Sequence, residues 1–211
     1  MLKTGPAAGI FWMCMATLIS SISGALVREL AGQIPTFELV FFRNLIAMVV
    51  LIAASNVLVQ HPINDWLTWG ALTYPVTFLV TDLLNRTEGP KAANRVIYVG
   101  FAVAVVASIA LATPRIAIAS GTAFLMAQLL DVRVFDRLRA GSWWKAPLVS
   151  STIASGVDTV LFFSIAFYGT QVPWQTLLLG DFLVKLAIAF VLLGPFRIMA
   201  RQAITAAGTA R

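Results

Sequence analysis

Seven long apolar segments take up most of the 211 residues and constrain the fold more than any other feature of the sequence. Each is long enough to cross a hydrocarbon core of about 30 Å, which requires about 20 helical residues. The connections between them are too short to bury a soluble core. The sequence therefore predicts an all-α, polytopic membrane protein whose spans occupy 7–27, 38–59, 66–84, 95–113, 115–131, 146–168 and 174–195.

Lysine and arginine residues concentrate in every second connection between these segments. They lie at 86–95, at 133–145 and after the last segment, whereas 61–65 and 170–173 contain none. Because cytoplasmic loops of membrane proteins are rich in Lys and Arg, we expect these basic regions, and the C-terminus, to be cytoplasmic. The net charge of +6 then reflects orientation in the membrane, and we expect no nucleic-acid partner.

The sequence lacks the patterns that indicate a metal cluster, an intrachain disulfide or a nucleotide-binding site. Cys14 is the only cysteine and His61 the only histidine, so this chain alone forms neither a disulfide nor a His/Cys metal cluster. There is also no Walker-type glycine-rich loop and no nucleophile elbow. We therefore expect no cofactor and no ATP hydrolysis by this chain.

Three charged residues interrupt the last two segments near their middle, where charge is costly and usually functional. Helical rise places Asp158 and Lys185 at the same depth, and Asp181 and Lys185 form an i,i+4 pair. We predict that both carboxylates share Lys185, which leaves one negative charge to bind a proton, a cation or a polar substrate. The alternative is an ion triad that only ties the two helices together.

The fifth segment carries a polar stripe with two further candidates, Gln128 and Asp131. The Gln128 amide can donate a hydrogen bond to a ring carbonyl and accept one from a ring N–H. Asp131 lies near the expected cytoplasmic surface beside Arg133 and Arg137. For Asp131, a surface ion pair is therefore at least as good an interpretation as a ligand.

The third segment is unusually polar for a membrane span. Asp82 has Arg86 four residues later, so it too is open to interpretation as an ion-pair partner or a ligand. Tyr74 and Pro75 stand earlier in the segment, and a proline there frees a backbone carbonyl that could face a cavity.

Five stretches resemble, in order and spacing, the vitamin uptake transporter-like family of queuosine precursor transporters. The resemblance covers about 45–198 and implies a six-helix inner-membrane protein that imports 7-cyano-7-deazaguanine or its aminomethyl relative. Its partners would be that small molecule and the lipid bilayer, with a homo-oligomer left open. The stretches are SNVLVQ (55–60), TWGALTYPVTFLVTDLLNRTEG (68–89), RIAIASGTAFLMAQLLDVRVFDRLR (115–139), WWKAPLVSSTIASGVDTVLFFSIAF (143–167) and GDFLVKL (180–186).

A 7-deazaguanine base would suit the predicted excess negative charge. Its amino-pyrimidinone edge presents neighbouring N–H donors to a carboxylate, and its flat face suits aromatic stacking. The family often carries Gly-Asn shortly before the aspartate of the sixth helix of this chain, where Ala154 and Ser155 stand here, so substrate preference could differ. The predicted substrate-binding residues are Asp158, Asp181, Lys185, Gln128, Asp82, Tyr74, Phe162 and Asp131.

The N-terminal part follows another pattern. Residues 1–50, and PTFELVFFRN within them, are similar to the first helices of EamA-like drug/metabolite transporters. We therefore expect an accessory segment at 1–44 that adds one extra helix, a six-helix transporter domain at 45–198, and a cytoplasmic tail at 199–211.

Two other functions compete with this interpretation. One is an intramembrane enzyme that uses Asp158 and Asp181 as an acid/base pair. A lysine between them favours ionisation of both, which suits binding better, so we expect no enzyme activity. The other is a transporter of a different heterocyclic metabolite or vitamin. The sequence leaves the energy source open among an ion gradient, metabolic trapping of the imported base and a partner protein.

Overall fold

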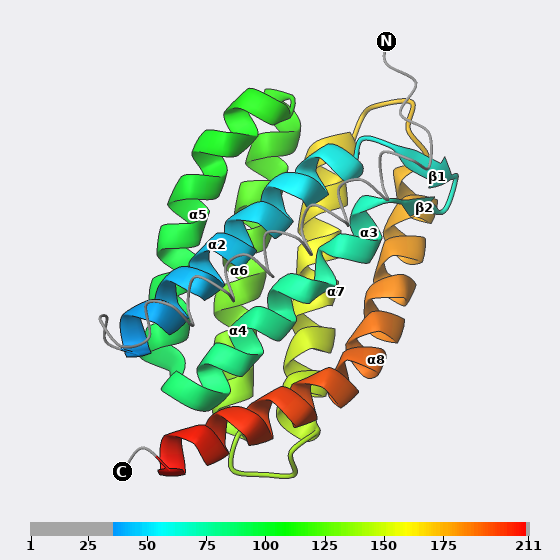
Figure 1. Ribbon diagram of the computed structural model, residues 1–211. Helices are drawn as coiled ribbons and strands as arrows, with labels where there is room; N and C mark the ends of the chain where they lie inside the picture. Colours follow the sequence, from blue (N-terminus) through cyan, green and yellow to red (C-terminus); the bar gives the residue numbers. More distant parts are fainter. Residues whose placement is uncertain (1–35, 210–211) are drawn as a thin grey trace.

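The computed structural model describes residues 36–209, which form a helical bundle with one short hairpin (Figure 1). This confirms the predicted all-α class. The segment 7–27 and Cys14 lie outside the described residues. In chain order the elements are α2 (Thr36–Leu58), β1 (Pro62–Asn64), β2 (Leu67–Thr68), α3 (Gly70–Thr73), α4 (Pro75–Glu88), α5 (Pro90–Leu111), α6 (Pro114–Leu138), α7 (Lys145–Phe167) and α8 (Trp174–Thr209).

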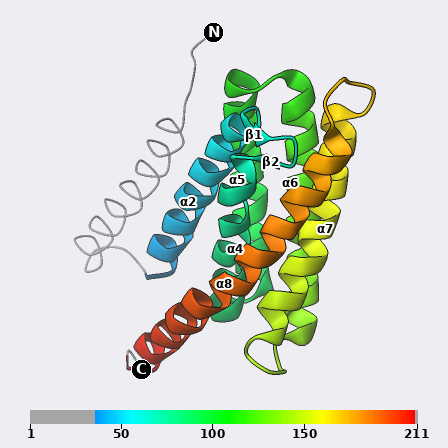
Figure 2. The same cartoon turned by 90° about the vertical axis from the view of Figure 1, so that its right-hand side faces the viewer.

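Four of the described helices are long and apolar enough to cross a membrane, at Phe41–Leu58, Pro114–Leu138, Lys145–Phe167 and Trp174–Gln202. Helix α5, with 22 residues, and the interrupted pair α3 and α4 pack among them (Figures 1 and 2). The chain is therefore a multi-pass membrane protein.

The largest differences from the predicted boundaries are in the third, fifth and seventh segments. The third segment is not one helix from 66 to 84: residues up to Thr68 form the hairpin, and the helix is interrupted at Tyr74. Pro75 explains the interruption, because proline has no N–H with which to continue the hydrogen bonding of α3. Helix α6 runs on to Leu138, and α8 continues through Pro195 to Thr209.

Connections that were predicted to share a side of the membrane lie at the same end of the bundle. At the upper end in Figure 1, Thr176 on α8 donates to the backbone carbonyl of Asp65, 2.6 Å away beside the hairpin. At the opposite end, Arg139 donates to the carbonyl of Asn85 at 3.0 Å, and Arg86 donates to that of Arg139 at 2.6 Å. The two basic connections therefore lie together at one end of the bundle.

The second half of helix α2 belongs to the core of the bundle. The helix runs unbroken across the predicted domain boundary between 44 and 45. Met48 and Ile52 are buried in a cluster with Phe78, Val96 and Phe124 from α4, α5 and α6. The two resemblances described above, over 1–50 and about 45–198, therefore meet inside one helix, and the second half of α2 packs against α4, α5 and α6.

The hairpin rests on α8 at Gly180. A Cβ atom added at this position would overlap the carbonyl oxygen of Trp66, so only glycine permits the observed approach. This contact holds the start of the α3 and α4 pair against α8, one residue from Asp181.

We predict that Gly180→Ala lowers the free energy of unfolding by about 1–3 kcal/mol, because the new methyl group must displace the Trp66 backbone. Thermal unfolding of the purified protein in detergent measures the effect. Gly194→Ala is the matched control, since a Cβ there meets nothing within 4 Å in the same helix. Equal melting temperatures for the two variants would contradict the prediction.

Candidate functional site

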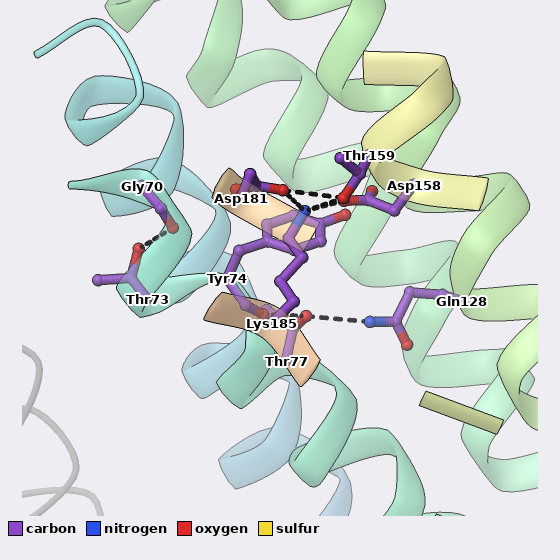
Figure 3. Close-up of polar contacts among 9 residues, drawn as sticks. All are labelled: Gly70, Thr73, Tyr74, Thr77, Gln128, Asp158, Thr159, Asp181 and Lys185. Atoms are coloured by element: carbon purple, nitrogen blue, oxygen red, sulfur yellow. Dashed lines mark hydrogen bonds and ion pairs between the residues drawn. The ribbon is translucent and has the colours of Figure 1, made fainter. Parts of the chain in front are cut away.

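Lys185 on α8 lies at the centre of a buried ion cluster between α7 and α8 (Figure 3). Its Nζ is 2.7 Å from Oδ2 of Asp158 and 2.5 Å from Oδ2 of Asp181. Thr159 accepts a hydrogen bond from Lys185 at 3.0 Å and donates one to Asp181 at 2.8 Å. None of the four residues is more than 4% exposed. The predicted sharing of Lys185 by two carboxylates is therefore confirmed.

The lysine is fully engaged while the carboxylates are not. An ammonium has three N–H donors, and Asp158, Asp181 and Thr159 give it three acceptors. It contacts each aspartate through Oδ2, so the Oδ1 atom of each remains for another donor. Two negative charges and one positive charge also leave the cluster with one negative charge in excess.

Tyr74 closes one side of this cluster. The Lys185 ammonium lies 5.0 Å from the centre of the Tyr74 ring, a cation–π contact across α4 and α8. The ring is buried, and its hydroxyl points toward Asp158 without a hydrogen bond of good geometry (Figure 3). The interruption before Pro75 places Tyr74 here, so the sequence signal at Tyr74 and Pro75 was informative.

A pocket opens beside the cluster and is lined by residues from α2, α3, α6, α7 and α8 and by Tyr74 between α3 and α4. Its open volume is only about 30 Å³, which holds about two water molecules and not a bicyclic base. The sequence analysis missed its uncharged polar residues, which carry no signal of burial in an apolar helix. The lining residues used below are Ser55, Asn56, Tyr74, Ser120, Asp158 and Phe162.

Gln128 lies away from this pocket, at the contact of α4 with α6. Its Nε2 donates to Thr77 Oγ1 at 3.0 Å, and its Oε1 accepts from Thr81 Oγ1 at 2.7 Å. Gln128 is fully buried, and these bonds occupy both ends of its amide. It therefore joins the two helices.

Asp82 and Asp131 form a second carboxyl pair at the same helix contact. The two groups lie within hydrogen-bonding reach of each other, and Ser151 donates to Oδ2 of Asp82 at 3.2 Å. Asp131 is fully buried, while Arg133 is exposed, so the interpretation of Asp131 as half of a surface ion pair is wrong. Among the described residues, neither carboxylate forms an ion pair.

A multi-pass helical bundle with a charged, partly aromatic pocket buried between its helices has the architecture of a small-solute membrane transporter. A family model agrees with this class. The chain belongs to the family described as "Putative vitamin uptake transporter", whose model matches residues 68–113 and 106–200, more than half of the chain.

Curated relatives support the same membership. A "Probable queuosine precursor transporter" of Haemophilus influenzae is 38% identical over 186 residues, covering 69% of this chain and 79% of the relative. The "Queuosine precursor transporter" of Escherichia coli is 32% identical over 193 residues, covering 78% of this chain and 87% of the relative. A "Probable queuosine precursor transporter" of Bacillus subtilis is 26% identical over 167 residues, with 65% and 72% covered. No solved structure matches the chain.

We predict that Lys185→Met destabilises the fold by about 3–5 kcal/mol, because it leaves two buried carboxylates without their counter-ion. Thermal unfolding in detergent measures the loss. The double variant Lys185→Met/Asp181→Asn restores the original excess of one negative charge and should recover part of the stability. Wild-type stability in the single variant would show that the cluster is not a charge-balanced unit.

Proposed function

We propose that this protein imports a queuosine precursor of the 7-deazaguanine class across the bacterial inner membrane into the cytoplasm. Family membership and the names of three curated relatives support the substrate class. The observation that carries the proposal in this chain is the cluster at Lys185, where a buried aspartate beside aromatic rings retains an oxygen that the lysine does not use.

Asp158 is the recognition group in this proposal. Its carboxylate faces a pocket that also contains Phe162 and Tyr74. The amino and ring N–H groups of a 7-deazaguanine lie side by side and would donate to this carboxylate, while the flat base stacks on an aromatic side chain. Lys185 holds Asp158 in place and favours its ionised form, and Asp181 in turn holds the other side of Lys185.

The polar lining from the other helices completes the recognition. The Tyr74 hydroxyl is free to donate to a ring carbonyl, and Ser55, Asn56 and Ser120 supply further polar groups around the base. Gln128, Asp82 and Asp131 line the contact of α4 with α6, and we assign them a supporting position next to the substrate pocket. Because the pocket is too small for the base, loading requires a wider state in which α7, α8 or α2 has moved.

The same cluster argues against the enzymatic alternative. Acid/base catalysis needs a carboxyl group that exchanges its proton during the reaction. Lys185 donates to both Asp158 and Asp181 and so stabilises the ionised form of each. A binding role therefore fits this geometry better than a shared catalytic proton, and the transport family supports a non-enzyme role.

The proposed unit of transport is 45–198, with 1–44 as an accessory segment. The family model begins at 68 and ends at 200, inside or close to those bounds. Residues 199–209 continue α8 without a break, so the proposed cytoplasmic tail starts as helix. Substrate specificity within the deazaguanine class would rest on the residues of this pocket. Ala154 and Ser155 are both buried on α7 but do not line it; Ser155 lines the neighbouring pocket that contains Asp82.

We predict that Asp158→Asn reduces uptake about tenfold or more, because the amide removes one acceptor and the charge that the base requires. The assay uses cells unable to make 7-cyano-7-deazaguanine, supplies it in the medium and scores queuosine in their tRNA. The fold should persist, since Lys185 keeps Asp181 as a counter-ion.

Asp65→Asn is the matched control, because this exposed aspartate undergoes the same change outside the pocket. Full restoration of queuosine by Asp158→Asn, at wild-type levels of inserted protein, would remove Asp158 from the binding site. Failure of the wild-type protein itself would refute the proposed substrate.

We also predict that the basic connections and the C-terminus face the cytoplasm. In a Cys14→Ser background, a cysteine placed at Thr170 should react in intact cells with a membrane-impermeant maleimide, and one placed at Ala140 should not. Both positions are exposed, and they lie in connections at opposite ends of the bundle. The reverse labelling pattern would show that the protein has the opposite orientation in the membrane.

A further inference from the structure

The carboxyl groups of Asp82 and Asp131 face each other inside the bundle, and among the described residues no salt bridge joins either of them to a cation. Asp82 is 2% exposed and Asp131 0% exposed. We propose that this pair is a proton-binding site, which holds one shared proton between its two carboxyl groups and exchanges that proton during transport. The binding site stands on the structure alone, whereas its coupling to transport rests on the function proposed above.

Contacts on both sides of the pair fix its geometry. Thr81, next to Asp82, donates to Gln128, one turn before Asp131 on α6. One turn further along α4, Asn85 donates from Nδ2 to the carbonyl of Val132 at 3.2 Å. Helices α4 and α6 are therefore held in register above and below the two carboxyl groups, which cannot easily separate.

The hydrogen bonding of the pair is incomplete without a proton. Both oxygens of Asp131 and Oδ1 of Asp82 have no hydrogen-bond donor among the described residues, although all three are buried. Two ionised carboxylates in such contact would repel each other strongly in a medium of low polarity. One bound proton removes that repulsion and supplies the missing donor, since a protonated carboxyl group donates to its ionised neighbour.

Among the described residues, no salt bridge joins a cation on a neighbouring helix to Asp82 or Asp131. Lys185 on α8 lines a pocket together with Asp82, but its three donors go to Asp158, Asp181 and Thr159. On α7 the groups that face the pair are the hydroxyls of two serines, Ser150 and Ser151.

Toward the basic end of the bundle, the cations of the described residues contact other groups or lie at the surface. Lys145 on α7 lies over the ring of Trp144, and Arg197 on α8 lies over the ring of Trp143. Arg86 donates to the carbonyl of Arg139, which itself donates to the carbonyls of Asn85 and Arg86. On α5, Arg95 is exposed and lies over the ring of Phe41. The exposed residues Lys91, Arg133 and Glu88 lie at the surface of the same end.

Lys185 offers a physical link between the proton pair and the substrate pocket. It lines the pocket that contains Asp158 and also the pocket that contains Asp82 and Ser151. A base that binds to Asp158 and shifts the lysine would change the positive charge near Asp82. Since a nearer cation favours the ionised carboxylate, that shift would promote release of the shared proton.

The binding site is tested without any substrate. Infrared spectra of the purified protein at neutral pH should contain the C=O stretch of a buried protonated carboxylic acid, shifted in D₂O. This band should disappear in both Asp82→Asn and Asp131→Asn and persist in the exposed control Asp65→Asn. Absence of the band from the wild type, or its persistence in both pair variants, would overturn the proposal. Stabilisation of a band-free protein by Na⁺ would identify a cation site instead.

The coupling is tested separately, with 7-cyano-7-deazaguanine in proteoliposomes. Wild-type protein should accumulate the base against its gradient when a pH gradient is imposed, and Asp131→Asn should lose this accumulation while exchange across the membrane falls much less. Gradient-independent transport by the wild type would refute the coupling and leave import intact. Absence of both accumulation and exchange in the wild type would refute the proposed function, with the infrared result still deciding the proton site.

Discussion

A lysine ammonium inside a membrane protein needs three acceptors, and supplying them fixes how α7 and α8 meet. Asp158 and Thr159 come from one helix and Asp181 from the other, so Lys185 binds across the interface at a single depth. The energetic gain of such a cluster is modest once desolvation is included, but loss of one member leaves an uncompensated charge. This requirement constrains helix register more tightly than apolar packing does, because an apolar side chain has a similar environment against lipid and against another helix.

A second polar contact fixes α4 against α6 in a different way. Gln128 satisfies both ends of its amide with Thr77 and Thr81, so that contact is neutral and complete. The adjacent pair of Asp82 and Asp131 is incomplete, with buried oxygens that lack donors among the described residues. The complete contact at Gln128 keeps α4 and α6 in place when the proton leaves. The incomplete carboxyl pair beside it is therefore suited to binding and releasing a proton.

The sequence predicted the elements whose signal is local. Apolar length located the four described helices that are long and apolar enough to cross a membrane, and it also located α5. The depth of the charges and their i,i+4 spacing predicted that Asp158 and Asp181 share Lys185. It could not predict Thr159, Ser55, Asn56 or Ser120, because an uncharged polar residue in an apolar helix can face lipid, a neighbour or a pocket. Asp131 was ambiguous for a related reason: proximity to Arg133 in sequence says nothing of the direction in which its side chain points.

Tyr74 shows how a local irregularity connects the two sites. The interruption at Pro75 lets α3 and α4 meet at Tyr74, whose ring covers the Lys185 ammonium. One turn and two turns later, Phe78 and Asp82 lie on the same face, and Asp82 reaches the pocket that Lys185 also lines. A single helix face therefore carries the ring beside the ion cluster at one end and half of the proton pair at the other. Any movement of α4 relative to α8 changes both environments at once, which is the physical condition that coupling between a substrate and a proton requires.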